Sequence, residues 1–224
     1  EAEAVGYADA LALYLAFVVS RAADRSSSIC SWDSSPKMEA LRNTFARQAI
    51  PMTWDFAEGN PFSRSSGNFQ DNVGFVASVV ERLTLSREGY ACQSNAEDAV
   101  KDLRVVATDP PYYDNIGYAD LSDFFYVWLR RSIGRFYPDL TATVLTPKAD
   151  ELVATPYRFG GSKAKAEEHF ERGFVHTFIR IREQHAPDVP LTIFYAFKQA
   201  ESDTEGTAST GWETMLNGLM EAGL

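Results

Sequence analysis

The sequence contains few of the residues from which disulfide scaffolds and metal centres are built. Its 224 residues include two cysteines, Cys30 and Cys92, which form no Cys-x-x-Cys pair, and three histidines. This composition excludes a disulfide-rich secreted domain and a zinc ribbon, and it makes a reducing cytoplasm the expected compartment. His169, His176 and His185 are spaced too widely for metal ligation without a further partner, so we expect no metal site.

Long apolar runs are absent as well. No stretch reaches the roughly 18 consecutive apolar residues of a membrane span. The most apolar segment, residues 10–19, follows acidic residues and precedes no small-residue cleavage site. We therefore expect neither a membrane partner nor a signal peptide.

Basic residues are outnumbered by acidic ones, 21 to 31, which gives a net charge of −10. This charge argues against nonspecific DNA binding by the chain as a whole. Between Phe124 and Arg182 the balance reverses, with 10 basic and 6 acidic residues, and Arg130, Arg131 and Arg135 lie in this part. The reversal fits a phosphate-contacting face and a solvated helix surface equally well.

An apolar segment, residues 105–108, runs directly into Asp109-Pro110-Pro111-Tyr112. Four specified positions that include two prolines occur by chance in well under about 1% of chains of this length. The segment predicts a β-strand with Asp109 at its carboxyl end, where open α/β sheets bind their ligands. Each proline fixes its φ angle and lacks an N–H, so the turn is stiff.

This turn suits a flat ligand with an exocyclic amine, such as adenine or cytosine. The Asp109 carboxylate and a main-chain carbonyl can accept the two N–H bonds and stabilise the positive charge that develops as the nitrogen attacks. Tyr112 can hold the base by stacking once the base has left the helix. The alternative is a tight turn without chemistry, but the strand before it and the helix after it favour the functional interpretation.

The turn and its flanks resemble the amino-methyltransferases that use S-adenosylmethionine to modify the exocyclic nitrogen of adenine or cytosine in DNA. One branch is particularly similar, the large adenine-specific DNA methylases of bacteria and archaea, several of which are found with phage-defence genes. The resemblance is carried by residues 109–118 and 121–129, by Trp54 to Phe62 and by Phe159 to Lys163. It implies S-adenosylmethionine as cofactor, DNA as partner, adenine or else cytosine as target, and partner subunits of a defence system.

The resemblance also implies roles for individual residues. The expected catalytic motif is Asp109, Pro110, Pro111 and Tyr112, and the expected contacts to the target nucleotide are Tyr112, Tyr113, Asn115 and Tyr118. Ser94-Asn95-Ala96 matches the turn that holds the cofactor adenine, with Asn95 in place of an aspartate. Asn95 and Asp109 are therefore the expected cofactor contacts, and a plain surface turn at Asn95 is the alternative.

A glycine-rich cofactor loop of the Phe-x-Gly-x-Gly type is missing. The nearest string, Phe159-Gly160-Gly161, follows no apolar strand. Because the loop lies toward the amino terminus in the family, we expect an internal piece of a larger protein, inactive alone and dependent on its upstream part for the cofactor site. The alternatives are a methyltransferase acting on RNA or on a protein amide nitrogen, and a nucleic-acid-binding module of the same fold without turnover.

The order of the expected elements predicts an α/β protein with an incomplete Rossmann-like methyltransferase sheet. A largely helical segment, residues 1–88, is inserted before the motif strand, and residues 89–224 form the partial catalytic domain. Helical periodicity predicts helices at 3–23, 71–85, 120–136 and 162–184, and one that begins at Pro36 and continues through Phe45. Residues 212–219 are expected to start a further helix. A second strand is expected at 190–198.

Two irregular stretches separate these elements. Residues 51–69 carry four aromatic rings, at Trp54, Phe56, Phe62 and Phe69, for which we predict ordinary packing, with a ligand-lining role as the alternative. Residues 138–161 contain three prolines and a glycine pair and are expected to form a long loop that reaches DNA.

Overall fold

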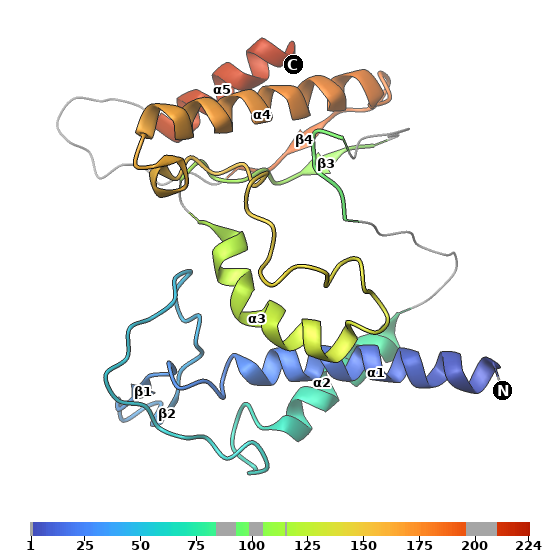
Figure 1. Ribbon diagram of the computed structural model, residues 1–224, viewed down its shortest axis with the longest axis vertical. Coiled ribbons are helices and arrows are strands. Elements are labelled where there is room, and N and C mark those ends of the chain that lie inside the picture. The colour runs from blue at the N-terminus through green and yellow to red at the C-terminus, as the bar shows by residue number, and fades with distance from the viewer. Residues whose placement is uncertain (1, 84–92, 99–104, 115, 196–209) are drawn as a thin grey trace. The chain divides into compact units, whose positions relative to one another are not determined.

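The computed structural model describes residues 2–83, 93–98, 105–114, 116–195 and 210–224. In this part of the chain the protein is rich in helix, and each of its two sheets has two strands (Figure 1). The chain divides into two compact units. Unit 1 comprises residues 1–91 and 118–148, and unit 2 comprises residues 92–117 and 149–224. Residues 118–148, which we expected in the catalytic domain, thus belong with the N-terminal helices.

Unit 1 contains three helices, α1 (Ala2–Ala23), α2 (Phe69–Arg82) and α3 (Tyr118–Ile133), and α1 packs against the other two. All three were predicted from helical periodicity. The start of α2 is fixed by Asn68, whose side-chain oxygen accepts a hydrogen bond from the N–H of Asp71 at 2.8 Å. Such a cap satisfies one of the N–H groups that the first turn of a helix leaves unpaired.

The helix predicted from Pro36 through Phe45 is wrong. Strand β1 (Trp32–Asp33) instead pairs antiparallel with β2 (Ala40–Leu41), and residues 34–39 form the connecting turn. The Asp33 carboxylate accepts a hydrogen bond from the Ser35 N–H at 3.0 Å, and Glu39 has a left-handed φ of 37°. These local turn interactions compete with helix formation, and the three apolar residues at helical spacing were too few to outweigh them.

The prediction that the rings of residues 51–69 pack away from solvent is also wrong for three of the four. Trp54 is 91% exposed, Phe62 86% and Phe56 49%, whereas Phe69 is half-buried as the first residue of α2. The backbone here is held by short-range turns, such as the Asn60 side chain accepting from the Phe62 N–H at 2.9 Å. Turns of this kind fix the backbone without creating an apolar surface for the rings.

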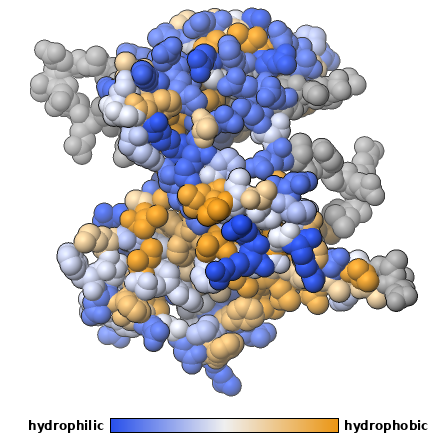
Figure 2. Space-filling model, in the orientation of Figure 1, coloured by the Kyte–Doolittle hydropathy of each residue, from blue (hydrophilic) through white to orange (hydrophobic). Residues whose placement is uncertain are grey.

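Helix α1 exposes much of its apolar surface, including Val5, Tyr7, Leu11, Leu15 and Phe17, and orange atoms follow this helix in Figure 2. Its segment Ala4–Ala23 is long and apolar enough to cross a membrane, and it is the one such helix in the described part of the chain. Core helices of soluble proteins and signal sequences meet the same requirement of length and composition. Length and composition alone therefore do not distinguish α1 from such helices.

Unit 2 contains β3 (Ala107–Thr108), β4 (Thr192–Ile193), the 3₁₀ helix η1 (Pro156–Phe159), α4 (Lys163–Gln184) and α5 (Thr210–Ala222). Strands β3 and β4 pair in parallel, and the ladder continues with a hydrogen bond from the Phe194 N–H to the Thr108 carbonyl at 2.8 Å. Helix α4 begins after Ser162, whose hydroxyl caps the N–H of Lys165. Helices α4 and α5 lie side by side in Figure 1 and pack against each other.

The core of unit 2 is an aromatic row on α4. Phe170, Phe174 and Phe178 recur every four residues and are at most 2% exposed. Val106 before β3 and Ile193 in β4 pack against this core from the strands, and Met215 packs against it from α5. Burial of each phenylalanine contributes about 1.5–3 kcal/mol relative to exposure, so this row is the main apolar contribution to the stability of unit 2.

The predicted Rossmann-like sheet is wrong. In the described residues the sheet that carries the motif has two strands of two residues each, β3 and β4. Parallel sheets are ordinarily covered on both faces, yet Val105 and Phe194, which alternate with the core residues, are 64% and 61% exposed. The apolar runs that suggested a sheet therefore cover one face of a helical core. Residues 196–198 of the second predicted strand lie outside the described residues.

Candidate active site at the Asp-Pro-Pro-Tyr turn

The motif follows β3 directly, so the predicted strand–turn arrangement is present at this point. Asp109 is exposed, Pro110 is buried and Pro111 is half-buried. No hydrogen bond to the main-chain carbonyl of Pro110 exists among the described residues. The turn thus presents a carboxylate in solvent, beside a carbonyl group that no described partner occupies.

The hydroxyl of Tyr112 donates a hydrogen bond of 2.7 Å to Oδ1 of Asp109. This bond fixes the orientation of the carboxylate and leaves its other oxygen, Oδ2, without a hydrogen bond among the described residues. A hydrogen bond to a charged group is worth about 1.5–3 kcal/mol, enough to favour one rotamer of an exposed aspartate. Tyr112, for which stacking on a base was predicted, therefore also holds the Asp109 carboxylate in place.

Tyr113 faces the opposite way and belongs to the core. It is 9% exposed, its ring meets Phe170 edge to face, and its hydroxyl donates to Glu167 at 2.8 Å. Burial, together with the hydrogen bond to the Glu167 carboxylate, raises the pKa of Tyr113. The predicted contact between Tyr113 and a nucleotide has no exposed ring face to support it.

The backbone of Tyr113 explains why consecutive tyrosines point in opposite directions. Its φ angle is 53°, in the left-handed region that bulky residues rarely adopt. The conformation is held by a hydrogen bond from the Ala154 N–H to the Tyr113 carbonyl at 3.0 Å. Local strain of about 1–3 kcal/mol is retained where the surrounding structure enforces it, and here it keeps the Asp109–Tyr112 pair outside the core.

Two residues that sequence reasoning treated only as strand and helix, Tyr195 and Trp212, complete the aromatic surroundings of the turn. The ring of Tyr195 meets Tyr112 edge to face at 5.4 Å and Trp212 at 6.1 Å, and its hydroxyl donates to the Gly211 carbonyl. Burial and the nearby Asp114 carboxylate raise the pKa of Tyr195. Because β4 is parallel to β3, the carboxyl end of β4 lies at the same edge of the sheet as Asp109. The order of the two predicted strands was therefore the sequence signal that could have placed Tyr195 near the motif.

The remaining predicted residues are not gathered at the turn by any described contact. The side chain of Asn95 accepts the N–H of Glu97 at 3.1 Å and so forms a local turn of its own. Tyr118 is 49% exposed as the first residue of α3, in unit 1. Asn115 lies outside the described residues.

The residues predicted to hold S-adenosylmethionine do not form a site for it in the described part of the chain. Asn95 and Asp109 share no hydrogen bond there, and the Asn95 side-chain oxygen already has a main-chain partner. Two cavities with described walls, of about 410 and 330 Å³, contain neither residue. The described geometry therefore supports binding of an amine at Asp109 but not binding of the cofactor between Asn95 and Asp109.

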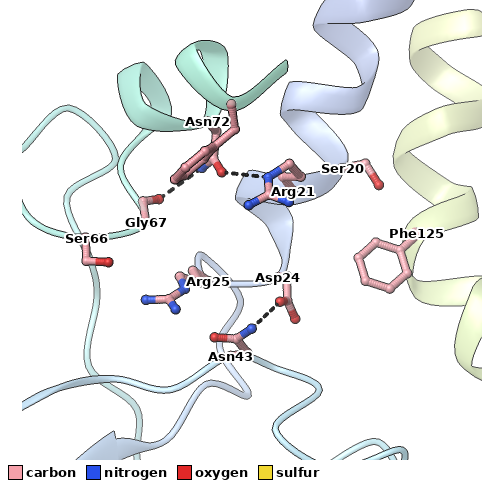
Figure 3. Close-up of a pocket in the computed structure, with 10 residues that line it drawn as sticks. Ser20, Arg21, Asp24, Arg25, Asn43, Ser66, Gly67, Asn72 and Phe125 are labelled. Atoms are coloured by element: carbon pink, nitrogen blue, oxygen red, sulfur yellow. Dashed lines mark hydrogen bonds between the residues drawn. The ribbon is translucent and has the colours of Figure 1, made fainter. Parts of the chain in front are cut away.

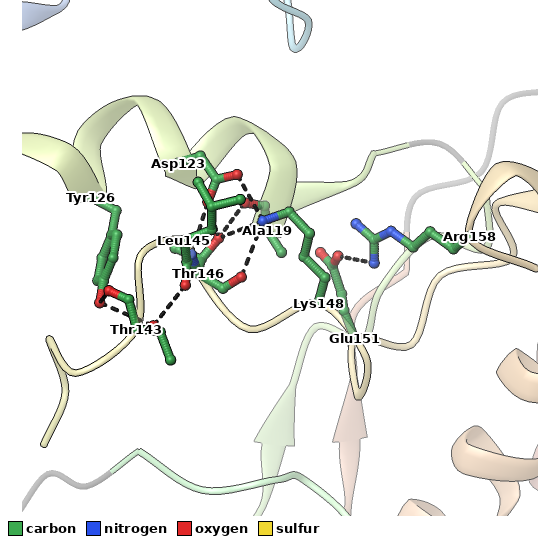
Figure 4. Close-up of polar contacts among 9 residues, drawn as sticks. All are labelled: Ala119, Asp123, Tyr126, Thr143, Leu145, Thr146, Lys148, Glu151 and Arg158. Carbon is green, nitrogen blue, oxygen red and sulfur yellow. Dashed lines mark hydrogen bonds and ion pairs between the residues drawn. The ribbon is translucent and has the colours of Figure 1, made fainter.

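The loop after α3, expected to reach DNA, is fastened to that helix through Asp123 (Figure 4). The Asp123 carboxylate accepts hydrogen bonds from the N–H and hydroxyl of Thr146 and from Lys148 Nζ at 2.7 Å. Burial raises the pKa of Asp123, but the hydrogen bonds from Lys148 and Thr146 outweigh it and hold the pKa below its usual value. Tyr126 anchors the loop further by donating to the Thr143 carbonyl.

Two of the three arginines, for which a phosphate-contacting face and a solvated helix surface fitted equally well, have partners within unit 1. Arg130 donates to the Thr141 carbonyl at 3.2 Å, and Arg135 lies 3.5 Å from Asp9 and over the ring of Phe136. The contact of Arg130 favours a structural role for this residue, whereas the Arg135–Asp9 pair is exposed and contributes little.

Comparison of the sequence with family models and with curated proteins, and of the fold with solved structures, finds no match. The resemblance to the amino-methyltransferases therefore rests on the residues quoted above, and the motif is the part of it to which chemistry can be assigned.

Proposed function

We propose that this protein contributes the amine-binding turn of a methyltransferase that modifies the exocyclic nitrogen of adenine in DNA. The observation that carries the proposal is the exposed Asp109 carboxylate at the carboxyl end of β3, held by the Tyr112 hydroxyl with Oδ2 available. A turn with only a structural role would not require a fixed, exposed carboxylate beside an aromatic ring.

In this proposal Asp109 Oδ2 accepts one N–H of the target amine, and the Pro110 carbonyl accepts the other. The two acceptors draw the nitrogen toward tetrahedral geometry and stabilise the positive charge that develops on it. Tyr112 holds the carboxylate and contacts the extruded base. The ring of Tyr195 lies against Tyr112, and the ring of Trp212 lies against Tyr195. Stacking on such rings stabilises a base that has left the duplex.

The methyl donor in this proposal is S-adenosylmethionine, and residues outside this sequence help to hold it. The proposal includes this second point because Asn95 and Asp109, the predicted cofactor contacts, share no hydrogen bond and no cavity in the described part of the chain. DNA is the proposed substrate because the motif suits a base amine, and association with other subunits of a defence system remains part of the same hypothesis.

The first test is replacement of Asp109 in the natural protein that contains this sequence. Transfer of labelled methyl groups from S-adenosylmethionine to unmethylated DNA is measured for Asp109→Ala and for Asp188→Ala, which removes an exposed acid elsewhere in unit 2. Loss of a preorganised electrostatic contact lowers kcat by about 100-fold or more, so we expect that loss for Asp109→Ala alone. Wild-type rates for Asp109→Ala would refute the proposal.

A second test separates the two functions assigned to Tyr112. Tyr112→Phe keeps the ring but removes the hydrogen bond to Asp109, and we expect it to lower kcat by about tenfold with little change in KM. Tyr112→Ala also removes the ring. KM for DNA should then rise as well, because the loss of one stacked base lowers the binding free energy by roughly 1–3 kcal/mol. Equal kinetics for Tyr112→Phe and the wild type would show that the hydroxyl does not position Asp109.

A further inference from the structure

A polar cavity of about 410 Å³ lies in unit 1, between the end of α1 and the start of α2. Its walls are formed by Ser20, Arg21, Asp24, Arg25, Asn43, Ser66, Gly67, Asn72, Phe75 and Phe125. In Figure 3 the guanidinium groups of Arg21 and Arg25 lie on the same side of α1, between Asn72 and Asn43. This volume is within the range of small-molecule sites in proteins.

Neither arginine has a carboxylate partner among the described residues. Arg21 donates through Nε to the side-chain oxygen of Asn72 at 3.2 Å, and its guanidinium lies over the ring of Phe75. Both contacts orient the group and leave its two terminal nitrogens without hydrogen bonds. Arg25 forms no side-chain hydrogen bond or ion pair in the described part of the chain, although it is half-buried. Arg21 is exposed, but a half-buried guanidinium group such as that of Arg25 is ordinarily paired with an anion.

The one carboxylate in the wall is already occupied by neutral donors. Oδ1 of Asp24 accepts the N–H of Phe45 at 3.2 Å, and Oδ2 accepts the amide of Asn43 at 2.8 Å. Asp24 thus fixes the loop that brings Asn43 to the cavity, and it forms no ion pair with the arginines next to it in sequence. With two arginines and one aspartate, the side chains of the wall carry a net positive charge.

Further donors and a close backbone approach complete the cavity. The hydroxyl groups of Ser20 and Ser66 form no hydrogen bond among the described residues. Gly67 has a φ of 87°, and a Cβ there would collide with Arg25 Cδ, so a glycine is required for the loop to approach this side chain. Stabilisation of the α1 dipole explains Arg21, which lies in the last turn, but not Arg25, which follows the end of the helix.

We propose that this cavity binds a phosphate group, held by the guanidinium groups of Arg21 and Arg25, with the hydroxyl of Ser66 on the same side of α1 as Arg25. Arginine suits this task because its planar fork matches two phosphate oxygens at once. The cavity is larger than a phosphate ion, so it has room for the rest of a nucleotide or for a stretch of nucleic-acid backbone. The inference involves no residue of the Asp109 turn and is independent of the proposed function.

The test uses the whole 224-residue chain and inorganic phosphate as the probe, followed by calorimetry and ³¹P NMR. We expect wild-type binding with a Kd of about 1 mM or tighter. Arg25→Gln and Arg21→Gln should each weaken it by about tenfold or more, as expected for the loss of a charge-assisted hydrogen bond. Arg47→Gln is the matched control, because Arg47 is exposed in unit 1 and does not line the cavity.

Two further probes identify the source of the phosphate. Tighter binding of adenosine monophosphate than of phosphate, with DNA binding unchanged by Arg25→Gln, indicates a nucleotide site. Binding of a short DNA strand that Arg25→Gln weakens and that phosphate displaces indicates the nucleic-acid backbone.

The proposal is overturned if the wild type binds no phosphate near that concentration, or if Arg47→Gln weakens binding as much as Arg25→Gln. Hydrogen exchange in α1 and α2 verifies that the variants are folded, and Arg25→Lys provides a variant that keeps the charge. Arg25→Lys should bind phosphate more tightly than Arg25→Gln and more weakly than the wild type, and affinity no better than that of Arg25→Gln would contradict the charge-based account.

Discussion

The two units of this protein use their apolar residues in opposite ways. Among the described positions, the buried apolar residues of unit 1 are Ala16, Val18 and Cys30, whereas unit 2 buries a continuous cluster around the phenylalanines of α4. Unit 1 instead exposes rings such as Trp54 and Phe62 and much of α1. Its described interior contains a polar cavity and buried hydrogen-bonding residues, including Thr44, Asn68 and Asn72.

This difference suggests a division of labour. The Asp109 turn projects from the unit with the aromatic core, and a rigid base is what a preorganised carboxylate requires. Unit 1 depends on directional hydrogen bonds, such as those of Asp123 and Asn72, which give less stability per contact than apolar burial. We therefore expect unit 2 to be the more stable of the two, and the following substitutions test that contrast.

The largest effect is expected for Phe174→Ala. This ring is 1% exposed and contacts both Phe170 and Phe178, so its removal should destabilise unit 2 by about 3–5 kcal/mol. Hydrogen exchange resolved by peptide should show the loss of protection in α4 and α5. Phe62→Ala removes an exposed ring from unit 1 and should change stability by less than about 0.5 kcal/mol. Similar losses from both substitutions would remove the contrast between the units.

An intermediate effect is expected in acid, at Asp123. The folded-state pKa of Asp123 is lowered, so its contribution to stability is present above its unfolded value, about pH 4, and is lost as the pH falls through the folded pKa. Asp123→Asn should lower the stability of unit 1 at neutral pH by about 1–3 kcal/mol, the worth of its charged hydrogen bonds.

The measurement is denaturant unfolding of unit 1 between pH 7 and pH 3, followed by a probe in α3. The stability difference between wild type and Asp123→Asn should shrink as the pH falls. A difference that is the same at pH 3 and pH 7 would show that the Asp123 charge does not hold the loop.

The smallest effect comes from a glycine substitution whose sign should differ between the units. A Cβ added at Gly74 in α2 meets nothing within 4 Å, so Gly74→Ala should stabilise unit 1 by about 0.5–1 kcal/mol. A Cβ at Gly218 in α5 lies 2.8 Å from the Phe174 ring, so Gly218→Ala should destabilise unit 2. Thermal unfolding of both variants tests these two expectations. Stabilisation by Gly218→Ala would mean that α4 and α5 pack less tightly than the 2.8 Å approach to Phe174 indicates.

Local features were the ones that the sequence could predict. The helices predicted in full by periodicity, α1, α2, α3 and α4, have bounds within a few residues of those expected, because their apolar spacing repeats over several turns. Helix α5, whose start was expected at Trp212, begins two residues earlier, at Thr210. The strand before Asp109 and its pairing partner were also located, although the described residues add no further strand to this two-stranded sheet.

The sequence by itself therefore determined the helices with repeated apolar spacing and the chemical groups of the Asp109 turn. The tertiary structure decided what those groups contact. Parallel pairing of β3 with β4 brings Tyr195 to Tyr112, and the left-handed backbone of Tyr113 sends its ring into the core. Arg25 and Gly67 meet at the cavity, although 41 intervening positions separate them in the sequence. Such contacts join residues distant in the chain, and spacing along a sequence reports only what lies within one helix, strand or turn.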